Sequence, residues 1–217
     1  MNADKKNLIK NLIEFGKEAY KRELIWGNSG NISHRLDENS IVISSSGAHL
    51  GKLSPEDFII FNLDSEKWKG TKKPSMETKI HTTILKKRKD VNCVFHSQPF
   101  FSTLIACSNL EIDPRLFPES MAYLDKVRRV PYHHPGSREL VQAISETIEG
   151  CNALVLTNHG VICTAKSLEG ALLRTETLEM LCRMIASAKI GNIRLNFLPQ
   201  FTKDDFLKHL SKMDKTP

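Results

Sequence analysis

Residues 91–101 read VNCVFHSQPFF, and this stretch decides how the chain is to be interpreted. The apolar run Val91–Phe95 predicts a buried strand that ends at His96. Side chains alternate along an extended chain, so His96 and Gln98 are expected to point to the same side. Two histidines there would form half of a metal site. One histidine and a glutamine leave three possibilities open: a metal enzyme, a weakened one, or a relative without the metal.

Length and composition bound the class of protein. The 217 residues, 40% of them hydrophobic and 26% charged, predict a single domain over residues 1–217. No apolar run approaches the roughly 20 residues of a membrane span, and the charged start MNADKKNLIKNLIEF does not predict a signal peptide. Five scattered cysteines without a CxxC motif favour the cytoplasm. The net charge of +6 comes without a nucleic-acid-binding motif, so we expect neither a nucleic-acid nor a membrane partner.

Strand and helix patterns alternate along the chain. The first helix is predicted over residues 4–24 and is broken by GNSGN at 27–31. The further predictions are strands at 41–44, 58–62, 91–96, 153–157 and 161–164, and helices at 74–88, 99–107, 138–149 and from a Ser167 cap to 189. A short helix is predicted from Thr202, a loop at 64–73 and, because of four prolines, a broken, loop-rich stretch at 109–137. This order predicts an α/β sandwich whose helices cover a sheet.

Two small polar turns could bind an anion. Gly27-Asn28-Ser29-Gly30-Asn31 offers backbone amides and polar side chains, but it follows a helix and lacks the spacing of a dinucleotide site, so an ordinary turn is favoured. The second turn, residues 44–47, follows a strand and could hold phosphate oxygens through Ser46 and backbone N–H groups. An ordinary serine turn explains it equally well.

The segment PSMETKIH, residues 74–81, places a carboxylate near a helix start. Glu77 and His81 are four residues apart and therefore lie on one helix face. Glu77 could transfer protons, or it could only stabilise the helix N-terminus. For His81, a hydrogen-bonded core histidine is the favoured interpretation.

Two histidines at predicted strand ends, His96 and His159, could meet in a cleft at the sheet edge. A catalytic zinc needs about three protein ligands and one open position, so two histidines alone are weak support for such a site. His133 and His134 form a further donor pair in a proline-flanked segment, or simply part of a solvated loop.

Taken together, segments over about residues 5–190 resemble the class II aldolase/adducin family. GNSGNISHR resembles the family's Gly-Asn-x-Ser-x-Arg turn, which implies that Asn31 faces the substrate phosphate. ISSSG resembles its Thr/Ser-Gly turn, which implies the same for Ser46 and Gly47. PYHHPGSREL resembles the family's loop and helix between the metal-ligand segments.

The catalytic and metal-binding residues follow from the same resemblance. PSMETKIH resembles the family's Pro-Ser-Ser-Glu segment, so Ser75 would contact the phosphate and Glu77 would be the catalytic acid/base. VNCVFHSQ and TNHGV resemble the segments that carry the three zinc histidines, so His96 and His159 would be ligands. Gln98 stands at the second of these histidines, and its amide oxygen is a poorer zinc ligand than imidazole.

The resemblance implies a three-layer α/β/α sandwich with a mixed, mainly antiparallel sheet. It also implies a homotetramer with the active site at a subunit interface, and a divalent metal, zinc first among them. The expected function is a metal-dependent lyase or aldolase acting on a small phosphorylated keto-sugar. Two departures leave alternatives open: Gln98, and Met76 in place of the family's second serine. The alternatives are a metal-independent activity on the same scaffold and a non-catalytic, adducin-like assembly protein. The aldolase subgroup's tyrosine has no clear match, although Phe117 and Tyr123 lie near its place.

Overall fold

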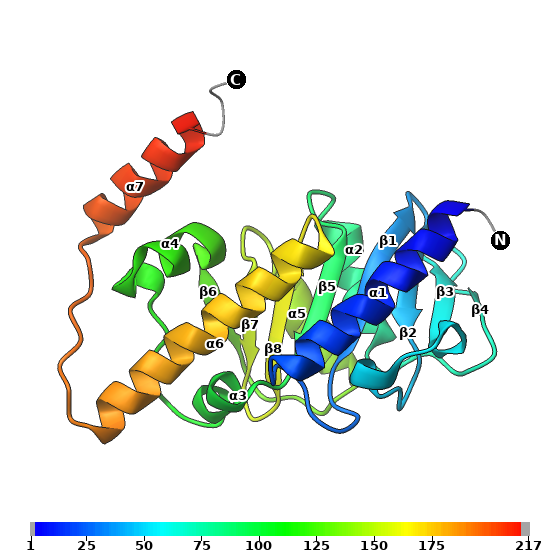
Figure 1. Ribbon diagram of the computed structural model, residues 1–217, viewed down its shortest axis with the longest axis horizontal. Helices are drawn as coiled ribbons and strands as arrows, with labels where there is room; N and C mark the ends of the chain where they lie inside the picture. The colour runs from blue at the N-terminus through cyan, green and yellow to red at the C-terminus, as the bar shows by residue number, and fades with distance from the viewer. Residues whose placement is uncertain (1–2, 214–217) are drawn as a thin grey trace.

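One mixed sheet runs through the computed structural model, which describes residues 3–213 (Figure 1). Its strands lie in the order β4-β3-β2-β1-β5-β8-β7-β6. All neighbouring pairs are antiparallel except β6 and β7, which are parallel. The strands are β1 (Asn31–Asp37), β2 (Ser40–Ser44), β3 (Phe58–Asn62), β4 (Trp68–Lys69), β5 (Cys93–Ser97), β6 (Val127–Val130), β7 (Ala153–Leu156) and β8 (Gly160–Ala165).

Helices cover both faces of this sheet. In Figure 1, α1 and α6 cross the front of the sheet, whereas α2 and α5 lie behind it. The helices are α1 (Ala3–Lys21), α2 (Thr78–Lys87), α3 (Phe100–Ala106), α4 (Pro118–Leu124), α5 (Arg138–Thr147), α6 (Leu168–Ile190) and α7 (Gln200–Met213). The predicted three-layer α/β/α sandwich with a mixed, mainly antiparallel sheet is confirmed.

The alternation of side chains along β5 explains the two cores. Cys93 and Phe95 pack in a cluster with α1, and Phe95 meets the ring of Phe15 at 4.8 Å between centroids. Val94 points to the other face, into the cluster formed by α2 and α5. Because alternate side chains of a strand face opposite sides, a run that is apolar throughout is buried on both faces. The prediction of a buried strand is therefore confirmed, with β5 in the middle of the sheet.

Helix α2 begins four residues later than the sequence suggested. It was predicted from residue 74, but Ser75 forms a turn in which its carbonyl accepts a hydrogen bond from the Thr78 N–H at 3.0 Å. The helix starts at Thr78, with Glu77 at the N-cap position. The Glu77 carboxylate therefore lies at the mouth of the helix, where it is free to turn toward the sheet.

The segment 109–137 is broken, as predicted, but it is not made of loops alone. This segment contains α4 and β6, because Pro118 occupies the first turn of α4, where a proline costs no hydrogen bond. The predicted loop at 64–73 contains the two-residue strand β4, and β1 was not predicted at all. Helix α1 ends at Lys21 instead of 24, and α7 begins at Gln200 instead of Thr202.

The last two helices leave the sheet. Ser167 caps α6 as predicted, since its side chain accepts a hydrogen bond from the Gly170 N–H at 3.1 Å. An extended segment then leads to α7, which stands away from the layers in Figure 1 and is held to α4 by Lys203 and Asp125, 3.0 Å apart. All five cysteines are free. None of the helices within residues 3–213 has the length and apolarity needed to cross a bilayer.

Candidate active site and metal centre

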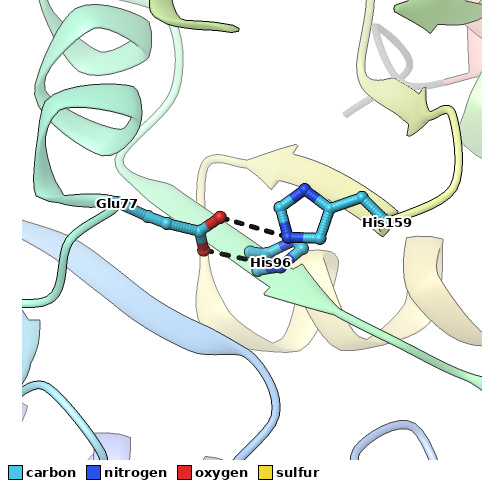
Figure 2. Close-up of side chains that lie close together, drawn as sticks. All are labelled: Glu77, His96 and His159. Atoms are coloured by element: carbon cyan, nitrogen blue, oxygen red, sulfur yellow. Dashed lines mark ion pairs between the residues drawn. The ribbon is translucent and has the colours of Figure 1, made fainter. Parts of the chain in front are cut away.

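Three side chains from distant parts of the chain converge where β5 and β8 meet the start of α2. Glu77 reaches toward two imidazoles (Figure 2). Its Oε2 lies 3.5 Å from His96 Nε2, and its Oε1 lies 3.3 Å from His159 Nε2. The two histidine rings meet edge to face with centroids 4.8 Å apart. Among the described residues these three form the group of His, Cys, Asp and Glu side chains that could hold a metal ion.

His96 is held in the tautomer that a metal ligand needs. Its Nδ1 lies 3.0 Å from the carbonyl oxygen of Val161. A carbonyl only accepts hydrogen bonds, so Nδ1 carries a proton and Nε2 is the nitrogen that faces Glu77. In the neutral ring the Nε2 lone pair points at the Glu77 carboxylate, so that two electron-rich atoms face each other. A cation between them would relieve this arrangement.

His159 and Glu77 leave buried atoms without partners. His159 sits in the tight turn between β7 and β8, where Asn158 adopts a left-handed φ of 54°. Burial lowers the pKa of His159 to about 4, so the ring is neutral and can act as a ligand at physiological pH. His159 Nδ1 and Glu77 Oε1 are both buried without a hydrogen bond. The donor set of two imidazoles and a carboxylate therefore fits a divalent transition metal.

The carboxylate of Glu77 is kept ionised. Burial by itself opposes its ionisation, but His96 and a hydrogen bond from Asn31 together hold the pKa of Glu77 below its usual range. Asn31 Nδ2 donates to Glu77 Oε2 at 2.7 Å. Asn31, expected from the resemblance to face a phosphate, thus also contacts the expected acid/base. A buried carboxylate with one free oxygen beside two imidazoles is suited to exchange a proton with a bound substrate.

Two glycines allow this close approach of strands. A Cβ at Gly160 would lie 2.6 Å from the Ser97 carbonyl oxygen, 2.8 Å from Gln98 Cγ and 3.3 Å from His96 Cε1. A Cβ at Gly30, where φ is 78°, would lie 2.6 Å from the His96 carbonyl oxygen. Both positions need glycine so that β1 and β8 can flank the end of β5.

Gln98 lies close to the cluster of Glu77, His96 and His159 and at the edge of a groove. Its side chain is half-buried against Gly160, directly after the turn that carries His159. It also lines a groove of about 870 Å³ whose apolar walls include Trp26, Phe100 and Leu104. Gln98 and His96 both lie close to Gly160. The role of Gln98 as a weak metal ligand or a hydrogen-bonding neighbour stays a prediction.

Two of the segments expected to bind phosphate, the turn at 44–47 and the segment around Ser75, lie side by side. Ser45 pairs with Pro74 in an antiparallel bridge, and the Ser46 N–H donates to the Lys73 carbonyl at 3.0 Å. This brings Ser46 and Gly47 next to Ser75, whose hydroxyl accepts a hydrogen bond from the Glu77 N–H at 3.2 Å. Ser46 and Gly47 are exposed, and Gly47 has a φ of 71°.

Other candidates lie elsewhere. His134 faces Tyr132, whose hydroxyl is 3.2 Å from His134 Nδ1, and neither His133 nor His134 belongs to the metal group described above. Phe117 packs against the core under α3, α4 and α6. Tyr123 lines a separate cavity beside Arg88 and Arg174. Within the described residues, the chain's own fold does not bring either aromatic residue to Glu77.

Sequence analysis missed one buried polar residue near the site, Ser33. It lies on β1, a strand that was not predicted, and its hydroxyl is 2.7 Å from Nδ1 of His81. The signal was present, because Asn31 and Ser33 alternate with Ile32 in GNISHR, but polar residues in alternate positions do not mark a buried strand.

Comparison with known families rests on most of the chain. Residues 10–186 match the family described as Class II Aldolase and Adducin N-terminal domain. The chain belongs to this family. The predicted class, a class II aldolase-like enzyme, is confirmed. Class II aldolases are metal-dependent, and Glu77, His96 and His159 are a possible site for the ion.

Curated relatives of this family member are enzymes of sugar phosphates. An L-fuculose phosphate aldolase of Methanocaldococcus jannaschii is 34% identical over 176 residues, which cover 81% of this chain and 92% of the relative. A 5-deoxy-D-ribulose 1-phosphate aldolase of Bacillus thuringiensis serovar kurstaki is 30% identical, and the match covers 93% of this chain and 92% of the relative. A 3-oxo-tetronate 4-phosphate decarboxylase of Haemophilus influenzae is 29% identical, and the match covers 84% of this chain and 89% of the relative.

Solved structures share the fold over nearly the whole chain. YgbL of Klebsiella pneumoniae superposes with a TM-score of 0.85 at 26% identity and covers 93% of this chain and 98% of its own. An L-fuculose 1-phosphate aldolase gives a TM-score of 0.86 and covers 94% and 96%, at 23% identity, which supports the fold alone.

Proposed function

We propose that this class II aldolase family member cleaves a carbon–carbon bond in a small phosphorylated keto-sugar, with a divalent metal held by His96 and His159. The observation that carries the proposal is the convergence of Glu77 on two imidazoles, with Glu77 Oε1 and His159 Nδ1 buried and without hydrogen bonds. Retention of these three side chains argues against the non-catalytic alternative. The metal would polarise the substrate's carbonyl and stabilise the enolate that cleavage leaves.

Glu77 would carry the proton in this reaction. As the bond breaks, its electron pair stays on the carbon next to the ketone, and the hydroxyl beyond the bond becomes an aldehyde as it loses its proton. Glu77 takes that proton and returns one to the carbon that kept the electron pair, so no proton is lost or gained overall. Its position at the start of α2, 3.3 and 3.5 Å from the two histidines, supports this role.

The phosphate would bind at the paired turns. Ser46 and Gly47 lie beside the 73–75 segment, because the Ser46 N–H donates to the Lys73 carbonyl and Ser45 pairs with Pro74. Asn31 would contribute at the inner end, between the phosphate and Glu77. Hydroxyl and backbone N–H donors are the groups that hold phosphate oxygens in proteins.

Decarboxylation of a phosphorylated 3-oxo acid is the second candidate, favoured by the Haemophilus relative. Loss of CO₂ also leaves an electron pair next to a ketone, so the same metal and the same proton donor suffice. That reaction needs no hydroxyl proton to be removed. Because Glu77 is ionised at the start, it would first take up a proton from water and then pass that proton to the enolate carbon.

The test compares the two reactions on one preparation. Untagged protein is analysed for metal, stripped with a chelator, and reloaded with zinc, manganese or cobalt. Each form is assayed with L-fuculose 1-phosphate, 5-deoxyribulose 1-phosphate and 3-oxo-tetronate 4-phosphate, following aldehyde or CO₂ release. Turnover should need the metal, and Glu77→Gln should lower it by about 10²–10⁴-fold. Metal-loaded protein that turns over none of the three, or Glu77→Gln with unchanged turnover, contradicts the proposal.

We also propose a homo-oligomer, a tetramer as the resemblance implies. Trp26 and Phe100 are 64% and 71% exposed, on the walls of the apolar groove beside Gln98. Large exposed apolar side chains that share a groove are typical of surfaces that other chains cover. Light scattering at micromolar concentration should give a multiple of the chain mass. Only monomer would contradict this.

A further inference from the structure

A buried row of hydrogen bonds leads from β1 to Glu77. Ser33 Oγ lies 2.7 Å from His81 Nδ1, His81 Nε2 bonds Asn31 Oδ1, and Asn31 Nδ2 lies 2.7 Å from Glu77 Oε2. Ser33 and His81 are 0% exposed, and Asn31 and Glu77 are each 7% exposed. The row ends at Glu77, whose carboxylate lies 3.5 Å from His96 Nε2 and 3.3 Å from His159 Nε2.

The chemistry of the groups allows one arrangement when Glu77 is ionised. A carboxylate only accepts, so Asn31 must present its NH₂ group to Glu77 and its oxygen to His81. That oxygen also only accepts, so His81 carries its proton on Nε2. His81 Nδ1 then accepts from the Ser33 hydroxyl. Burial lowers the pKa of His81 to about 3, so the ring is neutral and has one proton to place.

We propose that His81 is a positioning residue, which acts through Asn31 to hold Glu77 Oε2 and thereby leaves Oε1 as the oxygen that exchanges the substrate's proton. This deepens the proposed function and rests on it. Oε1 is buried without a hydrogen bond and faces His159, whereas Oε2 is taken by Asn31. Because Asn31 could otherwise rotate its amide, the His81 N–H fixes which end of that amide Glu77 meets.

A merely structural role predicts something different. A core residue that only fills space between α2 and β1 could be apolar, since burying a polar group is costly unless all its hydrogen bonds are made. Here every ring atom that can bond is used, and the row ends on the one carboxylate that faces the two imidazoles. The contrast can be measured, because a space-filling role would affect stability and a positioning role would affect turnover.

The first experiment does not depend on activity. Long-range ¹H–¹⁵N NMR of the full chain at pH 7 should show His81 as the neutral Nε2–H tautomer. The neutral Nδ1–H tautomer, or a charged ring, would overturn the proposal, because His81 could then not donate to Asn31 as described. This outcome stands apart from the proposed function, which fails instead if the metal-loaded wild type turns over no substrate.

The second experiment compares three variants on the best substrate. His81→Leu should lower kcat by about 10- to 100-fold with KM within about twofold, because the carboxylate is misoriented but binding groups are kept. His81→Gln, whose amide can still donate to Asn31, should recover most of the lost kcat. Ile84→Ala is the matched control: it is 0% exposed one turn later on α2 and should lower stability while leaving kcat of the folded protein unchanged.

The outcomes decide between the two roles. An equal fall in kcat for His81→Leu and Ile84→Ala, or no recovery in His81→Gln, would mean that His81 only fills the core. If His81→Leu does not fold, Ser33→Ala takes its place. It removes the hydroxyl that His81 Nδ1 accepts from, and kcat should fall about three- to tenfold. Unchanged kcat in Ser33→Ala would then overturn the proposal.

Discussion

Gln98→His should tighten zinc binding, because it restores a third imidazole beside His96 and His159. The side chain at position 98 already lies against Gly160, with Cγ 2.8 Å from where a Cβ on that glycine would be. A flat imidazole ring fits against a residue without a side chain. The substitution therefore changes the donor atom while the backbone of β5 stays in place.

The size of the effect follows from the change of donor. A structural zinc site contributes about 10–16 kcal/mol over four ligands, or about 3 kcal/mol for each ligand. The glutamine oxygen supplies part of that already, and fixing a histidine ring costs about 0.5–1.5 kcal/mol. A net gain of about 1.4 kcal/mol or more remains, which is a tenfold lower Kd. Manganese, which prefers oxygen ligands, should gain less, so the ratio of zinc to manganese affinity should rise.

Titration of metal-stripped protein with zinc and manganese measures this directly. Gln142→His is the control, since Gln142 is exposed on α5 and bonds only Glu146 among the described contacts. That variant adds an imidazole far from the site and should leave the Kd unchanged. If Gln98→His binds zinc no more tightly than wild type, position 98 does not face the metal. If neither protein binds metal at millimolar concentration, the two histidines are remnants and the non-catalytic alternative gains.

Three further results are expected. Ser46→Ala should raise KM for a ketose phosphate by about tenfold with kcat little changed, measured by steady-state kinetics; an unchanged KM would remove Ser46 from the phosphate site. Gly160→Ala should lower the free energy of unfolding in urea by about 1–3 kcal/mol and weaken metal binding, because the new Cβ would lie 2.6 Å from the Ser97 carbonyl oxygen. Gly150→Ala is the control: its φ is 62° with open space around it, so it should lower the free energy of unfolding by about 1 kcal/mol and leave metal binding unchanged. The stability of metal-stripped protein should fall from about pH 6.5 toward pH 4.5, because unfolded His81 and His159 take up protons there and the folded residues, with pKa values of about 3 and about 4, do not. His81 should account for about 1.4 kcal/mol per pH unit of this fall, so the slope should be smaller by that amount in His81→Gln.

The elements that sequence predicted well are those whose burial is apolar. Strand β5 was predicted because Val94 and Phe95 belong to an apolar run that is buried on both faces. The turn at His159 was predicted because polar residues there separate two apolar runs. The segment 127–130 was missed because its middle residues are Arg128 and Arg129. Both arginines donate to carbonyl groups of neighbouring segments at the sheet edge. A prediction based on alternating apolar residues cannot detect a strand that is held by such polar contacts.

The site could be predicted as a set of residues but not as an arrangement. Glu77, His96 and His159 came from motifs, and their convergence was an expectation that the geometry meets at 3.3 and 3.5 Å. The predicted start of α2 was wrong because Pro74 and Ser75 resemble the first residues of a helix, whereas Ser75 forms a turn that precedes the helix. This displacement is what aims the Glu77 carboxylate at the sheet.

Strand β1 carries polar side chains at buried positions, and the candidate site accounts for them. It lies between β2 and β5, fully inside the sheet, yet it presents Asn31 and Ser33 where a core strand would carry apolar side chains. Those two residues bond Glu77 and His81. The imidazoles of His96 and His159 are instead set by β5 and β8, which Gly160 lets approach. The proposed metal ligands and the proposed acid/base are therefore positioned by different strands, so a change at Gln98 can alter metal affinity while the hydrogen bonds that orient Glu77 persist.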